Sequence, residues 1–442
     1  MVMETIFAQA SVRGKSGVAV FRISGEKTEF LLQKLTQKPT PAPGVMQLSK
    51  VYDFRTSPSY LIDQAMVVFF KNPRSFTGED VAEIHTHGSI AVADILLETL
   101  ASCQGVRLAE PGEFAKRAFW NNKMDLTKVE GLSDLIDAET SMQHKQASKQ
   151  MLGELGKLYS SWKDQLISIL ALIEVYIDFP EEDLPQKVAL KSKESILKLK
   201  SQILLHINDN RRGERLRSGI SLGIFGEPNV GKSSLINCLT RRDISIVTDI
   251  AGTTRDILEA HLDIGGYPFI IYDTAGIRHD SKDKVESIGI EKAVNLFADC
   301  DVKIIMLDAS KDAYISETVQ SLKDKDTIIV INKIDISNIE NVGDAILVSC
   351  KTQYGINNLT DAIIKKAEKL AGPSSMPGLT RSRYRTSLKK ALECIEKALF
   401  IEDPVFVSEE IRLACSQMRC LTGEIGVEDV LGSIFANFCI GK

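Results

Sequence analysis

The feature that most constrains this 442-residue chain is a glycine-rich loop at Gly226–Ser233, with the sequence GEPNVGKS. The loop follows a continuous apolar run, Ile220–Phe225, which is typical of a buried parallel strand, and it leads into a helix expected to begin at Lys232. Glycines let backbone N–H groups point inward around phosphate oxygens, and the helix N-terminus adds a partial positive charge. The loop therefore predicts a phosphate-binding site, with Lys232 at the β- and γ-phosphates and the Ser233 hydroxyl on Mg²⁺.

Further apolar runs follow the loop, each separated from the next by a helical or loop segment. They are Phe269–Tyr272, Val302–Leu307, Thr327–Ile331 and Ala345–Val348. Strands that alternate with helices predict a mostly parallel sheet with helices on both faces. We therefore expect an α/β domain at residues 216–372.

The rest of the chain has two other patterns of apolar and polar residues. Residues 1–119 carry short β-branched runs around one helical stretch, Ala91–Ser102, which predicts an α+β domain. Residues 120–215 have apolar residues at three-and-four spacing through Met151–Ile177 and Val188–Ile207, which predicts long helices. Helical texture returns at 373–442 after a Gly/Pro/Ser linker. The sequence thus predicts a multidomain α+β, all-α and α/β chain, whose α/β domain is inserted between two halves of a helical domain.

Polar motifs at the ends of the predicted strands indicate which nucleotide is bound. Asp273–Gly276 (DTAG) can hold Mg²⁺ through its acid and sense a γ-phosphate through a glycine N–H. Asn332–Asp335 (NKID) offers a carboxylate that can accept hydrogen bonds from the N1–H and the amine of guanine, a donor pair that adenine lacks. Ser349–Lys351 supplies a further turn beside the base. Motifs of this kind in this order predict a Ras-like P-loop GTPase domain.

The residues expected to bind GTP fall in the phosphate loop, a first switch segment and the motifs at the strand ends. They are Asn229, Val230, Gly231, Lys232, Ser233, Ser234, Thr248, Asp249, Ile250, Ala251, Gly252, Thr253, Thr254, Asp273, Thr274, Ala275, Gly276, Asn332, Lys333, Asp335, Ser349, Cys350 and Lys351.

Catalysis cannot follow the Ras pattern, because the glutamine that orients water there is replaced here by Ile277. Some other group must orient the water, and some other positive charge must offset the negative charge that develops in the transition state. Thr254 can complete the Mg²⁺ coordination, and the hydroxyls and carbonyls around it suit a hard monovalent cation. Arg278 and three acids, Asp283, Glu286 and Glu291, lie on the expected second switch. The residues alone do not choose among these acids.

These motifs together resemble the MnmE (TrmE) tRNA-modification GTPases, and the resemblance covers the whole chain. It rests on Asn229, Thr248–Asp256, Asp273–Arg278, Asp283–Glu291 and Phe438–Lys442, and in the first third on Ser75–Asp80, Pro111–Ala118 and Asn122–Leu126. It implies a K⁺-stimulated GTPase whose G domains dimerise across the nucleotide. Asn229, Thr248, Ile250 and Thr253 would then hold K⁺. Glu286 would orient the hydrolytic water, with Thr254 and Lys232 as further catalytic residues.

The same resemblance likens the first domain to the folate-binding domain of aminomethyltransferases. It implies that 5-formyl- or methylene-tetrahydrofolate binds at a homodimer interface formed by this domain. The matched contacts are Arg22, Glu83, Lys123 and Lys442, and Cys439 near the chain end is a candidate for the chemistry. Basic side chains suit the glutamate carboxylates of folate, and Glu83 suits a pterin amino/N–H edge.

The family implies a role in which the GTPase acts with an FAD-containing partner of the MnmG/GidA type, as a heterotetramer. Together they add a carboxymethylaminomethyl or aminomethyl group to carbon 5 of the wobble uridine of certain tRNAs. Two alternatives stay open. One is a GTP-switched RNA or ribosome assembly factor without modification chemistry, and the other is a folate-dependent transferase with a regulatory G domain.

Composition limits the setting of this activity. The 54 Lys and Arg residues against 59 Asp and Glu leave a net charge of −5, which argues against a blanket nucleic-acid binder and predicts weak binding of tRNA by this chain alone. The eight cysteines include no CxxC pair, and we find no signal peptide or membrane-length apolar run, so we expect a cytoplasmic protein. His85 and His87 share a strand face, but no further ligand cluster accompanies them to favour zinc.

Overall fold

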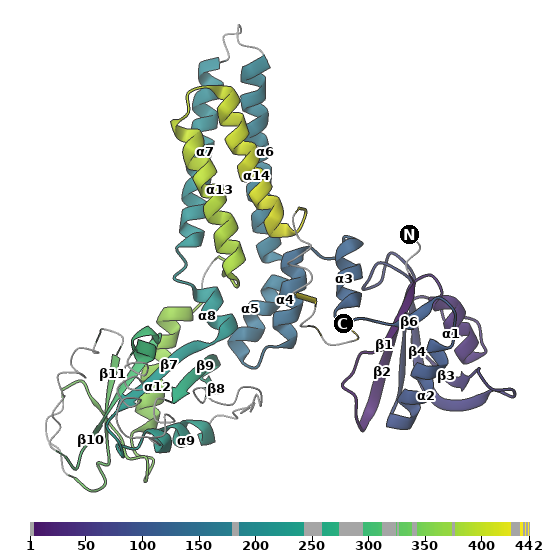
Figure 1. The fold of residues 1–442 in the computed structure, drawn as a ribbon, viewed down its shortest axis with the longest axis horizontal. Helices are drawn as coiled ribbons and strands as arrows, with labels where there is room; N and C mark the ends of the chain where they lie inside the picture. Colours follow the sequence, from purple (N-terminus) through teal and green to yellow (C-terminus); the bar gives the residue numbers. More distant parts are fainter. Residues whose placement is uncertain are drawn as a thin grey trace, which may run out of the picture. The chain divides into compact units, whose positions relative to one another are not determined.

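The computed structural model describes residues 4–178, 185–242, 259–273, 295–311, 324, 327–337, 343–373, 376–425, 434–435, 438 and 441. The chain divides into two compact units, which we treat separately. The first comprises Met1–Ser133 with Arg419–Lys442, and the second comprises Asp134–Met418. Figure 1 shows the elements of both units.

The first unit is built on a six-stranded sheet in the order β3-β4-β5-β2-β1-β6, in which only the β1–β6 pair is parallel. Its strands are β1 Thr5–Gln9, β2 Ser16–Ser24, β3 Gln47–Asp53, β4 Tyr60–Phe70, β5 Val81–Gly88 and β6 Val106–Leu108. Its helices are α1 Thr28–Thr36, α2 Ile90–Ala101 and α3 Glu113–Trp120, and α4 Leu126–Ile136 continues into the second unit.

Alternation along these strands gives the sheet two different faces. Phe21 and Ile23 of β2 are buried in one core together with the leucines of α1 and α2. Ile6 and Ala8 of β1 point to the other face, where they pack against Phe114 of α3. The α+β prediction is confirmed for this unit. The expectation of a single helical stretch among residues 1–119 is wrong, because α1 and α3 are also helical.

The α/β domain carries a second six-stranded sheet in the order β12-β11-β10-β7-β9-β8. Its strands are β7 Ile220–Gly226, β8 Glu259–Ile264, β9 Tyr267–Asp273, β10 Val302–Asp308, β11 Thr327–Asn332 and β12 Ile346–Leu347. Its helices include α9 Lys232–Arg242 and α12 Ile356–Ala371. Every pair is parallel except β8–β9, so the predicted mostly parallel sheet is confirmed.

The sequence analysis did not predict β8. This strand joins β9 through a two-residue turn at Gly265 and Gly266, whose φ angles are +64° and +87°. Positive φ at both central residues is what a tight antiparallel hairpin requires, so the Gly-Gly pair was the signal for an added edge strand. The backbone N–H of Met142 donates to the Gly266 carbonyl (3.1 Å) and so ties the turn to the helical part of the unit.

The remaining elements of the second unit are helices, as the spacing of apolar residues predicts. They are α5 Ser141–Met151, α6 Glu154–Asp178, α7 Pro185–Ile207, α8 Arg212–Ser218 and α13 Ser382–Phe400, and α14 Pro404–Thr422 continues into the first unit. The long helices α6, α7, α13 and α14 run side by side in Figure 1. Within the part of the chain that the structure describes, no helix is long and apolar enough to cross a membrane.

Candidate GTP-binding site

The phosphate loop joins β7 to α9 at the carboxyl edge of the sheet, between the neighbouring strands β9 and β10. Gly231 has φ +105°, and a Cβ atom added there would lie 2.3 Å from the Asn332 amide nitrogen. A Cβ atom at Gly226 would lie 2.6 Å from the Met306 carbonyl oxygen. Both positions therefore need glycine. Gly231 needs it for its backbone conformation and for space beside Asn332, and Gly226 needs it because the neighbouring strand packs closely.

Asn332 at the end of β11 links the phosphate loop to the Ser349–Lys351 loop, which is expected to lie beside the nucleotide base. Its side-chain amide donates to the Val230 carbonyl oxygen (2.8 Å), and its amide oxygen accepts from the backbone N–H of Cys350 (3.1 Å). The side chain is almost fully buried, so these hydrogen bonds replace those it would make to water. Segments that are about a hundred residues apart in the chain are thereby fixed to each other.

Lys232 lies where a phosphate-binding lysine begins its helix. Its ammonium group donates to the carbonyl oxygens of Gly226 (2.7 Å) and Glu227 (3.0 Å) in its own loop. The next two side chains, Ser233 and Ser234, are exposed at the start of α9. The loop thus presents a cation and hydroxyl groups at one helix N-terminus, which is the donor set that a nucleotide phosphate with Mg²⁺ needs.

The side chain of Asp335 is exposed and held by a buried hydroxyl. The Ser349 hydroxyl donates to one carboxylate oxygen of Asp335 (2.7 Å) and accepts from the backbone N–H of Thr352 (3.2 Å). One oxygen of the carboxylate is thereby oriented while the group as a whole stays open to solvent. An exposed, oriented carboxylate of this kind can accept the pair of hydrogen bonds that guanine offers.

Lys333 is fixed by a partner that the sequence analysis missed. Its ammonium group donates to the Asp308 carboxylate (2.6 Å), and Ser310 donates to the same carboxylate through its backbone N–H and its hydroxyl. Burial by itself would raise the pKa of Asp308, but the hydrogen bonds from Lys333 and Ser310 outweigh it and lower that pKa to about 2. The signal was an acid placed directly after the apolar run of β10.

Cys350 has a structural place in this site. Its carbonyl oxygen accepts from the Cys238 thiol (3.3 Å), in addition to the bond between its N–H and Asn332. Burial, followed by the neighbouring Cys238, raises the pKa of the Cys350 thiol to about 12. The thiol is therefore neutral at physiological pH. Lys351, the next residue, is exposed beside it.

The remaining predicted residues of the GTP site are outside the described part of the chain. Only the backbone of Asp273 is described, and it lies at the end of β9 in register with Ile224 of β7. Thr248, Asp249, Ile250, Ala251, Gly252, Thr253, Thr254, Thr274, Ala275, Gly276, Ile277, Arg278, Asp283, Glu286 and Glu291 lie outside the described residues. Asn229 is described, and it is exposed in the phosphate loop with φ +63°.

In the first unit, two of the predicted folate contacts lie together on the sheet. Arg22 of β2 and Glu83 of β5 are register partners, and the guanidinium donates to one carboxylate oxygen through two nitrogens (2.9 and 3.0 Å). The guanidinium also lies over the rings of Phe76 and Phe114, at 5.2 and 5.7 Å from their centroids. The pair is therefore on the face that carries α3.

The other folate candidates lie near this face or outside the described residues. The Lys123 ammonium donates to the Pro73 carbonyl oxygen (2.9 Å), and a Cβ atom at Gly78 would touch the Lys123 side chain. Lys442 and Cys439 lie outside the described residues, but a Cβ atom added at Gly441 would lie 2.6 Å from the carbonyl oxygen of Gln9 at the end of β1. Ala8 of β1 is the register partner of Arg22, so the chain end approaches the same three strands.

A cluster of three or more histidine, cysteine, aspartate or glutamate side chains able to hold a metal is absent from the described residues. The ring Nδ1 of His87 instead hydrogen-bonds with a carboxylate oxygen of Asp63 (2.9 Å). The ring Nε2 of His85 lies 3.4 Å from a carboxylate oxygen of Glu83.

The phosphate loop lies where the strand order of the sheet reverses, and Asn332 links it to the loops that carry and orient Asp335. This arrangement defines the α/β domain as a P-loop GTPase domain. The family model of the MnmE helical domain matches residues 126–439, and that of the GTP-binding protein TrmE N-terminus matches residues 5–123. The chain belongs to the MnmE family of tRNA modification GTPases, which confirms the resemblance found in the sequence.

Curated relatives match over their whole length. The tRNA modification GTPase MnmE of Orientia tsutsugamushi (strain Boryong) is 50% identical over 450 residues, and that of Rickettsia bellii (strain OSU 85-389) is 51% identical over 449 residues. In both cases 100% of each chain is covered. Among solved structures, Aquifex aeolicus Era bound to GDP·AlF4⁻ is 23% identical over 42% of this chain and 69% of its own, with a TM-score of 0.27. The G domain of the T. maritima FeoB iron transporter is 23% identical over 34% of this chain and 98% of its own, with a TM-score of 0.26.

Proposed function

We propose that this protein hydrolyses GTP to drive the modification of carbon 5 of the wobble uridine in certain tRNAs. The observation that carries the proposal is a GTPase site, organised by Asn332 and Asp335, in a chain that matches the family models of the MnmE helical domain and of the TrmE N-terminus. The full-length relatives named tRNA modification GTPase MnmE support the choice of tRNA. The cytoplasm is the compartment that fits this role.

The nucleotide site would use its described residues for binding and orientation. Asp335, oriented by Ser349, would read guanine, and Lys232 with the N–H groups of the phosphate loop would hold the phosphates. The exposed hydroxyl of Ser233 is a hard oxygen donor that fits Mg²⁺, and Thr254 would be the second protein ligand. Mg²⁺ would neutralise phosphate charge there.

For K⁺, the described residue that can be tested for fit is Asn229. Its amide is exposed at the mouth of the phosphate loop, and an amide oxygen suits a hard monovalent cation. Thr248, Ile250 and Thr253 would complete the set. A cation held here would place its positive charge where an arginine finger acts in other GTPases.

Exchanging K⁺ for Na⁺ in the assay is expected to slow GTP hydrolysis at least about tenfold at constant ionic strength and Mg²⁺, because the positive charge near the transferred phosphoryl group would be lost. The measurement is phosphate release by the full chain in each salt. The Asn229→Ala variant is the matched control and should be slow in both salts. Equal rates of the unaltered chain in K⁺ and Na⁺ would contradict the cation site.

The first unit would bind a 5-formyl- or methylene-tetrahydrofolate. Arg22 and Glu83 fit such a ligand because they set a guanidinium and a carboxylate side by side, bordered by the rings of Phe76 and Phe114. Lys123 and Lys442 would add positive charge for the glutamate carboxylates. The folate would supply the one-carbon unit, and Cys439 stays a candidate for a chemical role. We further propose that this domain forms the homodimer and that an FAD-containing MnmG/GidA-type partner completes a heterotetramer.

Nucleoside analysis of tRNA tests the proposed function directly. In a strain without this gene, the carbon-5 modification of wobble uridine should disappear, and the gene supplied in trans should restore it. If the wobble uridines of the deletion strain keep their carbon-5 modification, the result would instead favour a GTP-switched assembly factor without modification chemistry. A folate-dependent transferase with a merely regulatory G domain would keep the modification when GTP hydrolysis is abolished.

A further inference from the structure

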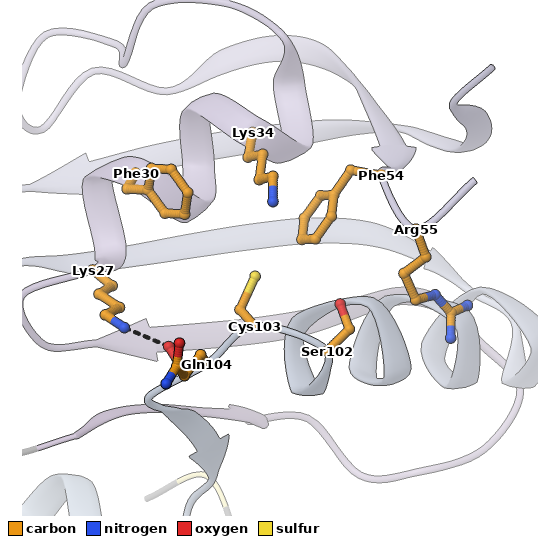
Figure 2. A pocket seen from close by; sticks show the side chains of 8 residues that line it. All are labelled: Lys27, Phe30, Lys34, Phe54, Arg55, Ser102, Cys103 and Gln104. Carbon is orange, nitrogen blue, oxygen red and sulfur yellow. Dashed lines mark hydrogen bonds between the residues drawn. The ribbon is translucent and has the colours of Figure 1, made fainter. Parts of the chain in front are cut away.

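The first unit contains a hollow on the sheet face opposite the Arg22–Glu83 pair. We call it the α1 hollow, and it is lined by α1, the end of β3 and the turn after α2, with a volume of about 700 Å³ (Figure 2). The lining residues that matter here are Lys27, Phe30, Lys34, Phe54, Arg55 and Gln104. Phe54 borders the core formed by α1 and α2, which places the hollow on the helical face of the sheet.

The charge of the α1 hollow is positive. Arg55 adds no positive charge, because it pairs with two carboxylates, those of Asp53 (2.8 Å) and Glu98 (2.8 Å), and the three groups together carry one negative charge. Lys27 donates to the backbone carbonyl of Gln104, which carries no net charge. The Lys34 ammonium lies over the rings of Phe54 and Phe30, at 4.5 and 5.5 Å from their centroids, and among the described residues it forms no ion pair. With the two lysines counted, the side chains named here leave one net positive charge at the hollow, in a protein whose net charge is −5.

The rings give the α1 hollow an aromatic platform. Figure 2 shows the Lys34 side chain between the rings of Phe30 and Phe54, with its nitrogen directed into the hollow. Phe30 is 54% exposed, and Lys34 is exposed as well. An exposed ring beside an exposed lysine can stack a base while the lysine turns to the adjoining phosphate.

We propose that the α1 hollow binds an unpaired nucleotide of the RNA substrate, with its base on Phe30 and its phosphate at Lys34 and Lys27. This inference rests on the proposed function, which makes RNA the substrate. An enclosed pocket would suit a free nucleotide, because small-molecule sites bury most of their ligand. The exposure of Phe30 instead describes an open platform of the kind that single-stranded nucleic acid uses. The hollow would supply positive charge for RNA binding in a chain whose net charge is −5.

The test measures binding of the full chain to a labelled tRNA transcript and to a single-stranded RNA octamer by fluorescence anisotropy, with GDP saturating the G domain. Phe30→Ala should weaken both complexes about tenfold, because a stacked base is lost. Lys34→Glu should weaken them similarly and flatten the dependence of log affinity on log salt by about one unit, because a phosphate contact is lost. Tyr60→Ala and Lys38→Glu are matched controls, since Tyr60 is 61% exposed and Lys38 is exposed outside the hollow.

The inference is overturned if the unaltered chain binds no RNA, or if the Phe30 and Lys34 variants bind RNA as tightly as their controls. It is also overturned if uridine monophosphate displaces the octamer at a comparable concentration. The last would identify a free-nucleotide site. A thermal unfolding profile like that of the unaltered chain shows that each variant is folded, and GTP hydrolysis at the unaltered rate shows that its G domain is intact. If the unaltered gene restores the tRNA modification while the variants bind tRNA normally, only this inference fails; if the unaltered gene restores nothing, the proposed function fails.

Discussion

Replacing Asp335 with asparagine is expected to lower the affinity for GTP by about 10⁴-fold and to favour xanthosine nucleotides instead. Guanine donates two hydrogen bonds to a carboxylate, whereas the asparagine amide would set a donor against one of those donors. Xanthine carries a carbonyl where guanine carries its amine, so it complements the amide. The Ser349 hydroxyl can still donate to the remaining oxygen at residue 335, and the loop should keep its conformation.

Titration with fluorescent guanosine and xanthosine diphosphates measures this change. Asp344→Asn is the matched control, because Asp344 is an exposed aspartate of the same domain. The control should bind guanosine diphosphate as the unaltered chain does. If Asp335→Asn keeps its preference for guanine, base recognition lies elsewhere in the domain.

Replacing Glu286 with alanine is expected to lower the turnover of GTP by about 10² to 10⁴-fold while leaving nucleotide affinity unchanged. In this proposal the carboxylate orients the hydrolytic water, so its contribution appears mainly in the transition state. Loss of kcat with an unaltered Kd is the pattern that such a residue produces. Single-turnover hydrolysis and equilibrium binding of a nonhydrolysable GTP analogue measure the two quantities separately.

The acids on either side supply the controls. Asp283→Asn and Glu291→Gln should hydrolyse GTP within a fewfold of the unaltered rate. If Glu286→Ala remains active and one of these variants does not, that acid takes the role of orienting water. This comparison matters because the sequence reasoning alone left the three acids equivalent, and only the family resemblance distinguished Glu286.

Local sequence was sufficient wherever a motif acts through its own backbone or through short spacing. The phosphate loop, the helix that begins at Lys232 and the run of parallel strands follow from glycine placement and apolar runs, and the structure has them as predicted. Edge strand β8 was missed because its apolar pattern is weak and its signal was a Gly-Gly turn. Helices α1 and α3 were missed because each spans only eight or nine residues.

The sequence by itself thus determined the GTPase domain, its base preference and the family, because hydrogen-bond polarity and strand-end position are encoded in a few adjacent residues. Only the tertiary structure decided that Asp308 holds Lys333 and that Arg22 pairs with Glu83 on the neighbouring strand. It also brought Phe30, Lys34 and Phe54 into one hollow. These contacts join residues that are distant in the chain, and they form only when buried strands and helices pack and leave few other partners for their polar groups.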